Sequence, residues 1–253
     1  MDRHTRMPSA RRQGGFTLVE LMVTVAIAMF LLAGLVTIVQ NIRGSYFNQQ
    51  QIVQLQDEQR FALTVMTDAV QAAGYFPNPA VDTTLNFGAT APFPAAGWVF
   101  AGTHAAGLPD QLSTRFMSGP LPDGTPAYGP VLCDGTDTSG LAANTWAVTF
   151  SVDTVKNQLQ CSVNGGPQIP LVGGVTGLTV YYGVKRNTVP VDYNVDTYET
   201  WDVLLASGTD WQNISAVRVI ITFQNPLFPQ ASQPQFVTVE RVIQVMGRGG
   251  MHT

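Results

Sequence analysis

The side chains that most often carry enzyme chemistry are few in this sequence and lie far apart. Its histidines are His4, His104 and His252, so no two of them have the spacing of a metal-binding pair, and His104 is expected in a surface loop. No Gly-X-Ser-X-Gly nucleophile motif and no Walker A loop occurs. A glycine cluster at residues 173–177 leads into a strand pattern, which predicts a turn rather than a phosphate site. The sequence therefore favours a structural protein over an enzyme, with no resident metal or cofactor.

Two acidic stretches leave alternatives open. Asp192, Asp196 and Asp202 lie near tyrosine and tryptophan residues, and paired carboxylates beside aromatic rings occur in glycosidases. A solvated loop explains the same acids more simply and is the favoured interpretation. Residues 134–140 have the Asp and Gly content of a calcium loop, but they lack the EF-hand spacing and its terminal Glu. Asx turns are favoured there.

The two cysteines are Cys133 and Cys161, which are too few for a zinc site built on thiolates. If this part of the chain leaves the cytoplasm, a disulfide closing a loop of about 28 residues is favoured, and the loop-entropy model gives it about 3–4 kcal/mol. Two buried free thiols are the alternative.

Glu20 is the only ionisable side chain in an otherwise apolar run at residues 16–39. As a helix this run has a length of about 36 Å, enough to cross a bilayer core of about 30 Å. A carboxylate near the centre of such a helix costs about 2.5–3.5 kcal/mol on insertion scales. We therefore expect Glu20 to have a partner.

Charge divides the chain at the same point. Residues 1–15 hold four arginines and one aspartate, a net +3, and the remainder holds nine basic and sixteen acidic residues. By the positive-inside rule, residues 1–15 stay in the cytoplasm and the chain beyond about residue 42 lies outside it. The acidic remainder offers no basic stripe for phosphates, so nucleic acid is not an expected partner.

Residues 14–20 read Gly-Gly-Phe-Thr-Leu-Val-Glu, which resembles the signature of the type IV pilin and type II secretion pseudopilin superfamily. That signature is a short basic leader ending in Gly, followed by Phe-Thr-Leu-X-Glu at the start of an apolar helix. The resemblance implies that a prepilin peptidase cuts between Gly15 and Phe16 and methylates the new amine of Phe16. It also implies that the Glu20 carboxylate pairs with the Phe16 amine of a neighbouring subunit in a filament, because an unpaired charge there is costly.

The later sequence predicts an α+β fold, with a long N-terminal helix packed on an antiparallel β-sheet domain. Apolar residues at three- and four-residue steps from Phe61 to Ala73 predict an amphipathic continuation of the helix, which ends at Gly74. Residues 75–145, rich in Pro and Gly, predict loops and short strands. Further on, period-two alternation predicts antiparallel strands that pack on the outer half of the helix. The expected strands cover residues 146–152, 159–163, 178–184, 217–223 and 237–245.

A second resemblance, to the PilW family of minor pilins, is carried by Leu159-Gln-Cys161, residues 169–184, Trp211 and Val217-Arg-Val219. It implies a structural subunit that takes part in type IV pilus assembly or initiation, whose β domain decorates or caps the filament. A minor pseudopilin of a type II secretion system and a pilus-tip adhesin module are the alternatives.

The expected organisation is a leader peptide at residues 1–15, a transmembrane and filament-core helix at 16–40, its amphipathic continuation at 41–74 and a periplasmic β-rich domain at 75–253. The expected location is the bacterial inner membrane, crossed once, and the pilus after incorporation. The expected partners are the major pilin and other minor pilins through the N-terminal helix, the prepilin peptidase and the inner-membrane assembly platform.

Overall fold

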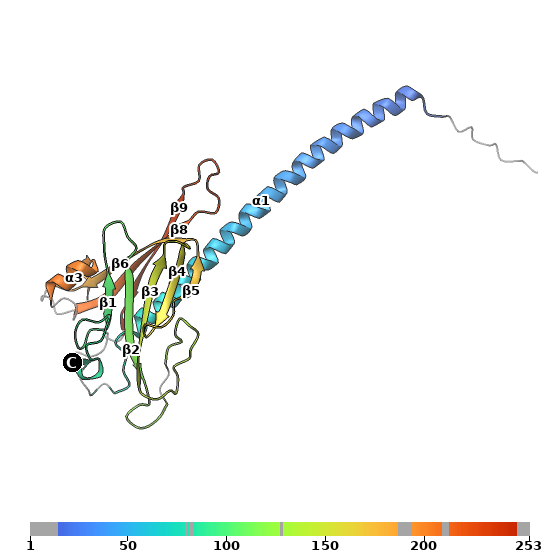
Figure 1. The fold of residues 1–253 in the computed structure, drawn as a ribbon. Helices are drawn as coiled ribbons and strands as arrows, with labels where there is room; N and C mark the ends of the chain where they lie inside the picture. Colours follow the sequence, from blue (N-terminus) through green and yellow to red (C-terminus); the bar gives the residue numbers. More distant parts are fainter. Residues whose placement is uncertain are drawn as a thin grey trace, which may run out of the picture. The chain divides into compact units, whose positions relative to one another are not determined.

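The computed structural model describes residues 15–78, 80, 83–126, 129–186, 194–208 and 213–246. The chain forms two units, Met1–Gln50 and Gln51–Thr253, and each is described by itself. The longest element, α1, spans Leu18–Ala72 (Figure 1).

In the first unit, α1 is apolar on all sides up to Val39 except at Glu20 and the threonines, and all of its side chains up to Phe47 are exposed. Among the described residues α1 is the one helix that is long and apolar enough to cross a membrane. Water does not stabilise so large a continuous apolar surface, so this part of the helix needs lipid or another apolar surface around it.

In the second unit α1 has one buried face. Leu63, Met66 and Val70 are buried, and their spacing of three and four residues places them on one side of the helix. Gly74 follows the last turn with a φ of +80°, and its N–H donates to the Arg115 carbonyl at 2.9 Å. Glycine adopts this left-handed conformation without a steric cost, which confirms the predicted helix end.

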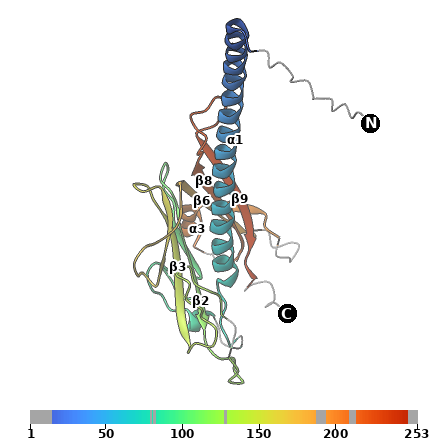
Figure 2. The ribbon, with the colours of Figure 1, turned by 90° about the vertical axis from the view of Figure 1, so that its right-hand side faces the viewer.

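Within the described residues the strands form two antiparallel sheets, and Figure 2 shows β2 and β3 of one sheet apart from β8 and β9 of the other. The five-stranded sheet has the order β1-β2-β3-β4-β5, and the four-stranded sheet has the order β7-β6-β8-β9. The strands are β1 Phe100–Thr103, β2 Gln111–Ser118, β3 Asn144–Asp153, β4 Gln158–Val163, β5 Ile169–Gly173, β6 Val175–Val184, β7 Thr197–Glu199, β8 Ile214–Gln224 and β9 Phe236–Gln244, and the short helices are α2 Thr83–Asn86 and α3 Trp201–Ser207.

The chain passes from the first sheet to the second at a single residue. Gly174 lies between the end of β5 and the start of β6 and has a φ of +70°. The glycine cluster is therefore a turn that leads into a strand, as its sequence predicts.

One hydrophobic core joins the helix to both sheets. It includes Met66 of α1, Leu112 and Phe150 of the first sheet, and Tyr182 and Val219 of the second. This arrangement of a long helix and antiparallel sheets confirms the predicted α+β fold. The five strands expected from period-two alternation are present as β3, β4, β6, β8 and β9.

Strand β2 is longer and more central than the loops and short strands predicted for residues 75–145. Five consecutive residues from Leu112 to Phe116 are buried, so both faces of this strand are covered. A strand covered on both faces shows no alternation of apolar and polar residues. The polar side chains in this strand, above all Arg115, make it still harder to recognise as a buried strand from its sequence.

Arg115 is 1% exposed and is bound by backbone carbonyls. Its Nε donates to the Trp98 carbonyl at 2.5 Å, one Nη donates to the Gly88 carbonyl at 2.6 Å, and the other Nη reaches two more carbonyls of the loop 87–98. The guanidinium also lies over the Phe93 ring at 4.3 Å from its centroid. Burial lowers the pKa of Arg115 to about 10, so the side chain stays charged at neutral pH. Its fixed fork of donors holds this loop against β2.

The structure joins Cys133 and Cys161 in a disulfide, with an S–S distance of 2.05 Å. Cys161 lies in β4 and is fully buried, whereas Cys133 lies in the chain between β2 and β3. The bond thereby ties this connection to the first sheet.

Replacing Arg115 with Met is expected to lower the free energy of unfolding by about 3 kcal/mol, because several buried carbonyls lose their donor at once. The measurement is denaturant unfolding of the full chain in detergent, followed by tryptophan fluorescence. Arg218→Met is the matched control, since Arg218 pairs with Glu240 on the surface and should leave the midpoint almost unchanged. Equal midpoints for the two variants would contradict the role given to Arg115.

Removing the disulfide by a Cys133→Ala change is expected to lower the free energy of unfolding by about 3–4 kcal/mol, because the unfolded chain regains the freedom of a long loop. The same denaturant titration measures this loss. A reducing agent should destabilise the wild type and leave the variant unchanged. A wild-type intact mass that does not increase on reduction would show that the two thiols are not bonded.

Candidate processing and assembly site

The expected cleavage point lies in accessible backbone. Gly15, Phe16 and Thr17 are exposed and precede the first helical residue, and the Phe16 side chain is 82% exposed. Among the described residues, no atom lies within 4 Å of the position that a Cβ on Gly15 would take. Residues 1–14 of the expected leader lie outside the described residues. An exposed, non-helical peptide bond is the form of backbone that a peptidase can bind.

Thr17 has a local role that the sequence prediction did not include. Its Oγ1 accepts a hydrogen bond from the Glu20 backbone N–H at 3.3 Å, and its carbonyl accepts one from Leu21 at 3.1 Å. A threonine three residues before a glutamate is the spacing of a capping box, and a carboxylate in the first turn is favoured by the helix dipole. The signal was present in the sequence as Thr-X-X-Glu.

The Glu20 carboxylate makes no hydrogen bond or ion pair within the described part of the chain. The other polar side chains along the apolar run are satisfied locally. Thr24 donates to the Leu21 carbonyl at 2.9 Å, and Thr37 donates to the Ala33 carbonyl at 3.0 Å. Glu20 is therefore the group of this run that still needs a partner, and that partner must come from beyond the described residues.

The other acids noted in the sequence are held in local turns. Asp134 accepts the Thr136 N–H and Asp137 accepts the Ser139 N–H, both at 2.9 Å, which confirms the favoured Asx turns. The hydrogen bond from the Ser139 backbone lowers the pKa of Asp137. Within the residues that the structure describes, no group of three or more His, Cys, Asp or Glu side chains is placed to hold a metal ion.

The acids considered for a glycosidase site also have local partners. Asp196 accepts the backbone N–H of Arg186 at 3.0 Å, and Asp202 accepts the Thr200 hydroxyl at 2.5 Å. Asp192 lies outside the described residues. Asp196 thus stabilises a loop, whereas Asp202 lies in the first turn of helix α3 and not in the solvated loop that the sequence predicts.

His104 is not the simple surface residue that the sequence predicts. It is partly buried, and its Nδ1 lies 2.8 Å from Oδ1 of Asp110. The second oxygen of Asp110 accepts the Val180 N–H at 2.8 Å, and the Asp110 N–H donates to the Leu178 carbonyl at 2.8 Å. Asp110 thus joins the start of β2 to strand β6 of the other sheet. The two residues are six positions apart in a loop, and no sequence pattern marks the pair.

Comparisons with known proteins bear on the N-terminal segment. A family model of the prokaryotic N-terminal methylation motif matches residues 10–36. No match was found among curated proteins. Among solved structures the chain is similar to the type IV-like pilin TTHA1219 from Thermus thermophilus, with 12% identity and a TM-score of 0.41, over 77% of this chain and 98% of that one. At this level the structural likeness carries no function over to this chain.

The methylation motif covers the segment in which Gly15, Phe16 and Glu20 lie. It supports the resemblance to the type IV pilin superfamily, and with it processing by a prepilin peptidase and a subunit of a pilus or pseudopilus. Together with the long apolar helix α1, the motif also supports anchoring in a membrane.

Proposed function

We propose that this protein is a minor pilin-like structural subunit of a type IV pilus, most similar to the PilW family, that takes part in pilus assembly or initiation. It is made as a precursor, cut between Gly15 and Phe16, methylated on Phe16 and held in the inner membrane by α1. The observation that carries the proposal is the Glu20 carboxylate, which has no partner among the described residues and lies in an exposed apolar helix just after an accessible Gly–Phe bond.

Cleavage supplies the partner that Glu20 needs. The new amine of Phe16 is positively charged at neutral pH, and methylation leaves it basic. In a filament core formed by stacked helices, a lone carboxylate is costly to bury, and an ammonium group on the neighbouring helix offsets that cost. The pair therefore favours one register between subunits over others.

The second unit, Gln51–Thr253, supplies the part of the subunit outside the membrane. A disulfide suits the oxidising periplasm, so the Cys133–Cys161 bond supports a periplasmic location for this unit. The protein is expected to contact the major pilin and other minor pilins through the apolar part of α1, and to engage the inner-membrane assembly platform. The alternative is a minor pseudopilin of a type II secretion system. Such a subunit has the same N-terminal motif and processing, but it is assembled into the pseudopilus of the secretion machine and not into a pilus.

The mature protein is expected to begin at a methylated Phe16 and to retain the whole apolar helix. Intact-mass measurement and N-terminal sequencing of the protein from cell membranes test this. A Gly15→Leu variant should remain uncut, because a branched side chain obstructs the approach of the peptidase to the backbone. A wild-type protein that still begins at Met1, or that has lost the apolar segment, would overturn the proposal.

A Glu20→Ala variant is expected to be cleaved normally but to enter filaments about tenfold less, because the Phe16 amine of each subunit loses its counter-charge. Glu20→Gln should behave in the same way, since it keeps the shape and removes the charge. The amount of the protein in sheared filaments, relative to its amount in membranes, measures the effect.

Asp57→Ala is the matched control for these variants, because Asp57 is an exposed acid on the same helix beyond the apolar run. It should enter filaments at the wild-type level. Normal incorporation of both Glu20 variants would remove the pairing role.

A further inference from the structure

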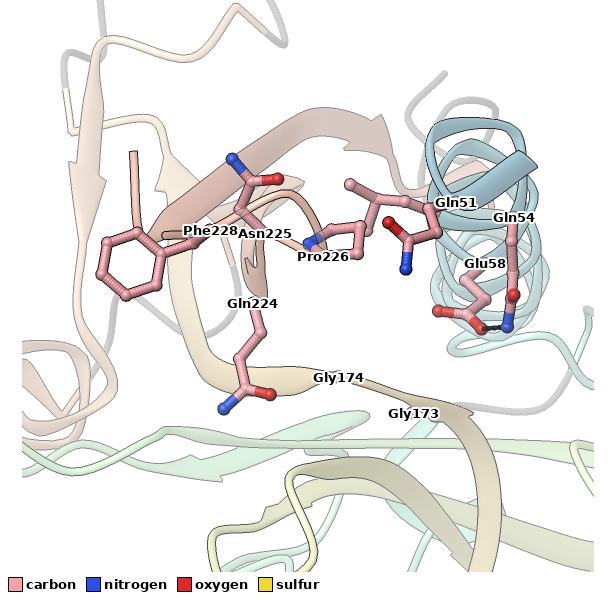
Figure 3. A pocket seen from close by; sticks show the side chains of 10 residues that line it. Gln51, Gln54, Glu58, Gly173, Gly174, Gln224, Asn225, Pro226 and Phe228 are labelled. Atoms are coloured by element: carbon pink, nitrogen blue, oxygen red, sulfur yellow. Dashed lines mark hydrogen bonds between the residues drawn. The ribbon is translucent and has the colours of Figure 1, made fainter. Parts of the chain in front are cut away.

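A groove of about 460 Å³ lies within the second unit, beside the stretch of α1 from Gln51 to Glu58. Its other walls are the Gly173–Gly174 crossover between the sheets, and Gln224 at the end of β8 with the loop that follows as far as Phe228 (Figure 3). Its volume falls in the range of small-molecule sites, about 300–1,000 Å³.

The loop wall is fixed by the buried side chain of Asn225. Its Nδ2 donates to the Pro234 carbonyl at 2.8 Å, and its Oδ1 accepts the Leu227 N–H at 3.0 Å. The neighbouring Gln224 N–H donates to the Gly174 carbonyl at 2.7 Å, which joins the loop to the crossover. These contacts hold the backbone of the loop wall and the Asn225 side chain in place, so this wall of the groove is preformed.

The open polar groups of the groove are mainly amides. The side chains of Gln51 and Gln224 make no hydrogen bond to any of the described residues. Gln54 donates to the Glu58 carboxylate at 3.0 Å, and that carboxylate retains further acceptor sites. Phe228 lines the groove with a side chain that is 48% exposed, and its ring lies at the end of the groove away from Gln51 and the Gln54–Glu58 pair (Figure 3). This ring offers an apolar surface that a ligand long enough to span the groove can reach.

This lining distinguishes between classes of ligand. Among the described residues that line the groove there is no Lys or Arg, and the one charged side chain is Glu58, which disfavours phosphates and acidic polymers. The amides disfavour a lipid chain, because burying them without hydrogen bonds is costly. A sugar hydroxyl both donates and accepts, as an amide group does, and the C–H face of a sugar ring packs on an aromatic ring.

We propose that this groove binds a neutral oligosaccharide. One sugar ring lies against Phe228, and hydroxyl groups pair with Gln51, Gln224 and the Gln54–Glu58 pair.

The test is calorimetric titration of the full chain with two neutral probes, cellotetraose and N-acetyl-chitotetraose. The protein is kept in a zwitterionic detergent, because a detergent with a sugar head group would compete for the groove. Saturable binding of at least one probe is expected. Phe228→Ala and Gln224→Ala should each weaken it about tenfold, because each removes one main contact of the sugar.

Two control variants lie outside the groove. Tyr198→Ala removes an exposed ring from β7, at the opposite edge of the sheet, and Gln56→Ala removes an exposed amide from α1. Both should bind as the wild type does, and the unfolding midpoints of all four variants should match. The proposal is overturned if neither probe saturates the wild type at about 10 mM, or if the groove variants bind as tightly as the controls. Loss of filament incorporation in the groove variants without sugar binding by the wild type would also overturn it, and would identify the groove as a contact between subunits.

Discussion

The cost of burying one carboxylate, that of Glu20, limits the environments in which the N-terminal helix of this chain is stable. Glu20 cannot remain charged in an apolar environment without a partner, and none of the described residues supplies one. The precursor lacks the Phe16 amine, because Gly15 still occupies that nitrogen in a peptide bond. If the chain is cut after Gly15 as proposed, the cut creates a cation only four positions before Glu20. In that case processing comes before stable assembly, since only a cut chain can neutralise its neighbour's carboxylate.

In the second unit, by contrast, two buried ionisable side chains find their partners within the unit. Arg115 is buried, but the carbonyls of the loop 87–98 surround its guanidinium. Asp110 is also buried, and it is satisfied by His104 and by the backbone of Val180. Each of these buried charges has its partners within the unit, so the contacts join loops and sheets of the same chain. Among the described residues of the first unit, none pairs with the Glu20 carboxylate, and the apolar side chains of α1 up to Phe47 are exposed.

The difference between local and long-range contacts explains which features could be predicted from the sequence. Local patterns were sufficient for the apolar helix, the glycine at its end and the strands with one covered face, because each depends on neighbours in the chain. Strand β2 was missed because Arg115 and the residues around it are buried on both faces. The Asp110 contacts and the groove were not predictable, since they join residues far apart in sequence, such as Gln51 and Gln224. The N-terminal motif was recognisable because all of it lies in one short segment, which the methylation-motif model matches at residues 10–36.

Successive parts of helix α1 suit different surroundings, because the distribution of apolar side chains around the helix changes along its length. Up to Phe47 it is exposed and mostly apolar on all sides, which suits lipid and other helices. Beyond Ala62 its apolar residues are confined to one face, which the sheets of its own unit bury. Between these parts, Gln51, Gln54 and Glu58 recur at helical spacing and border the groove. Leucine at these positions would extend the buried face, whereas amides and a carboxylate keep the groove hydrated and open to a polar ligand.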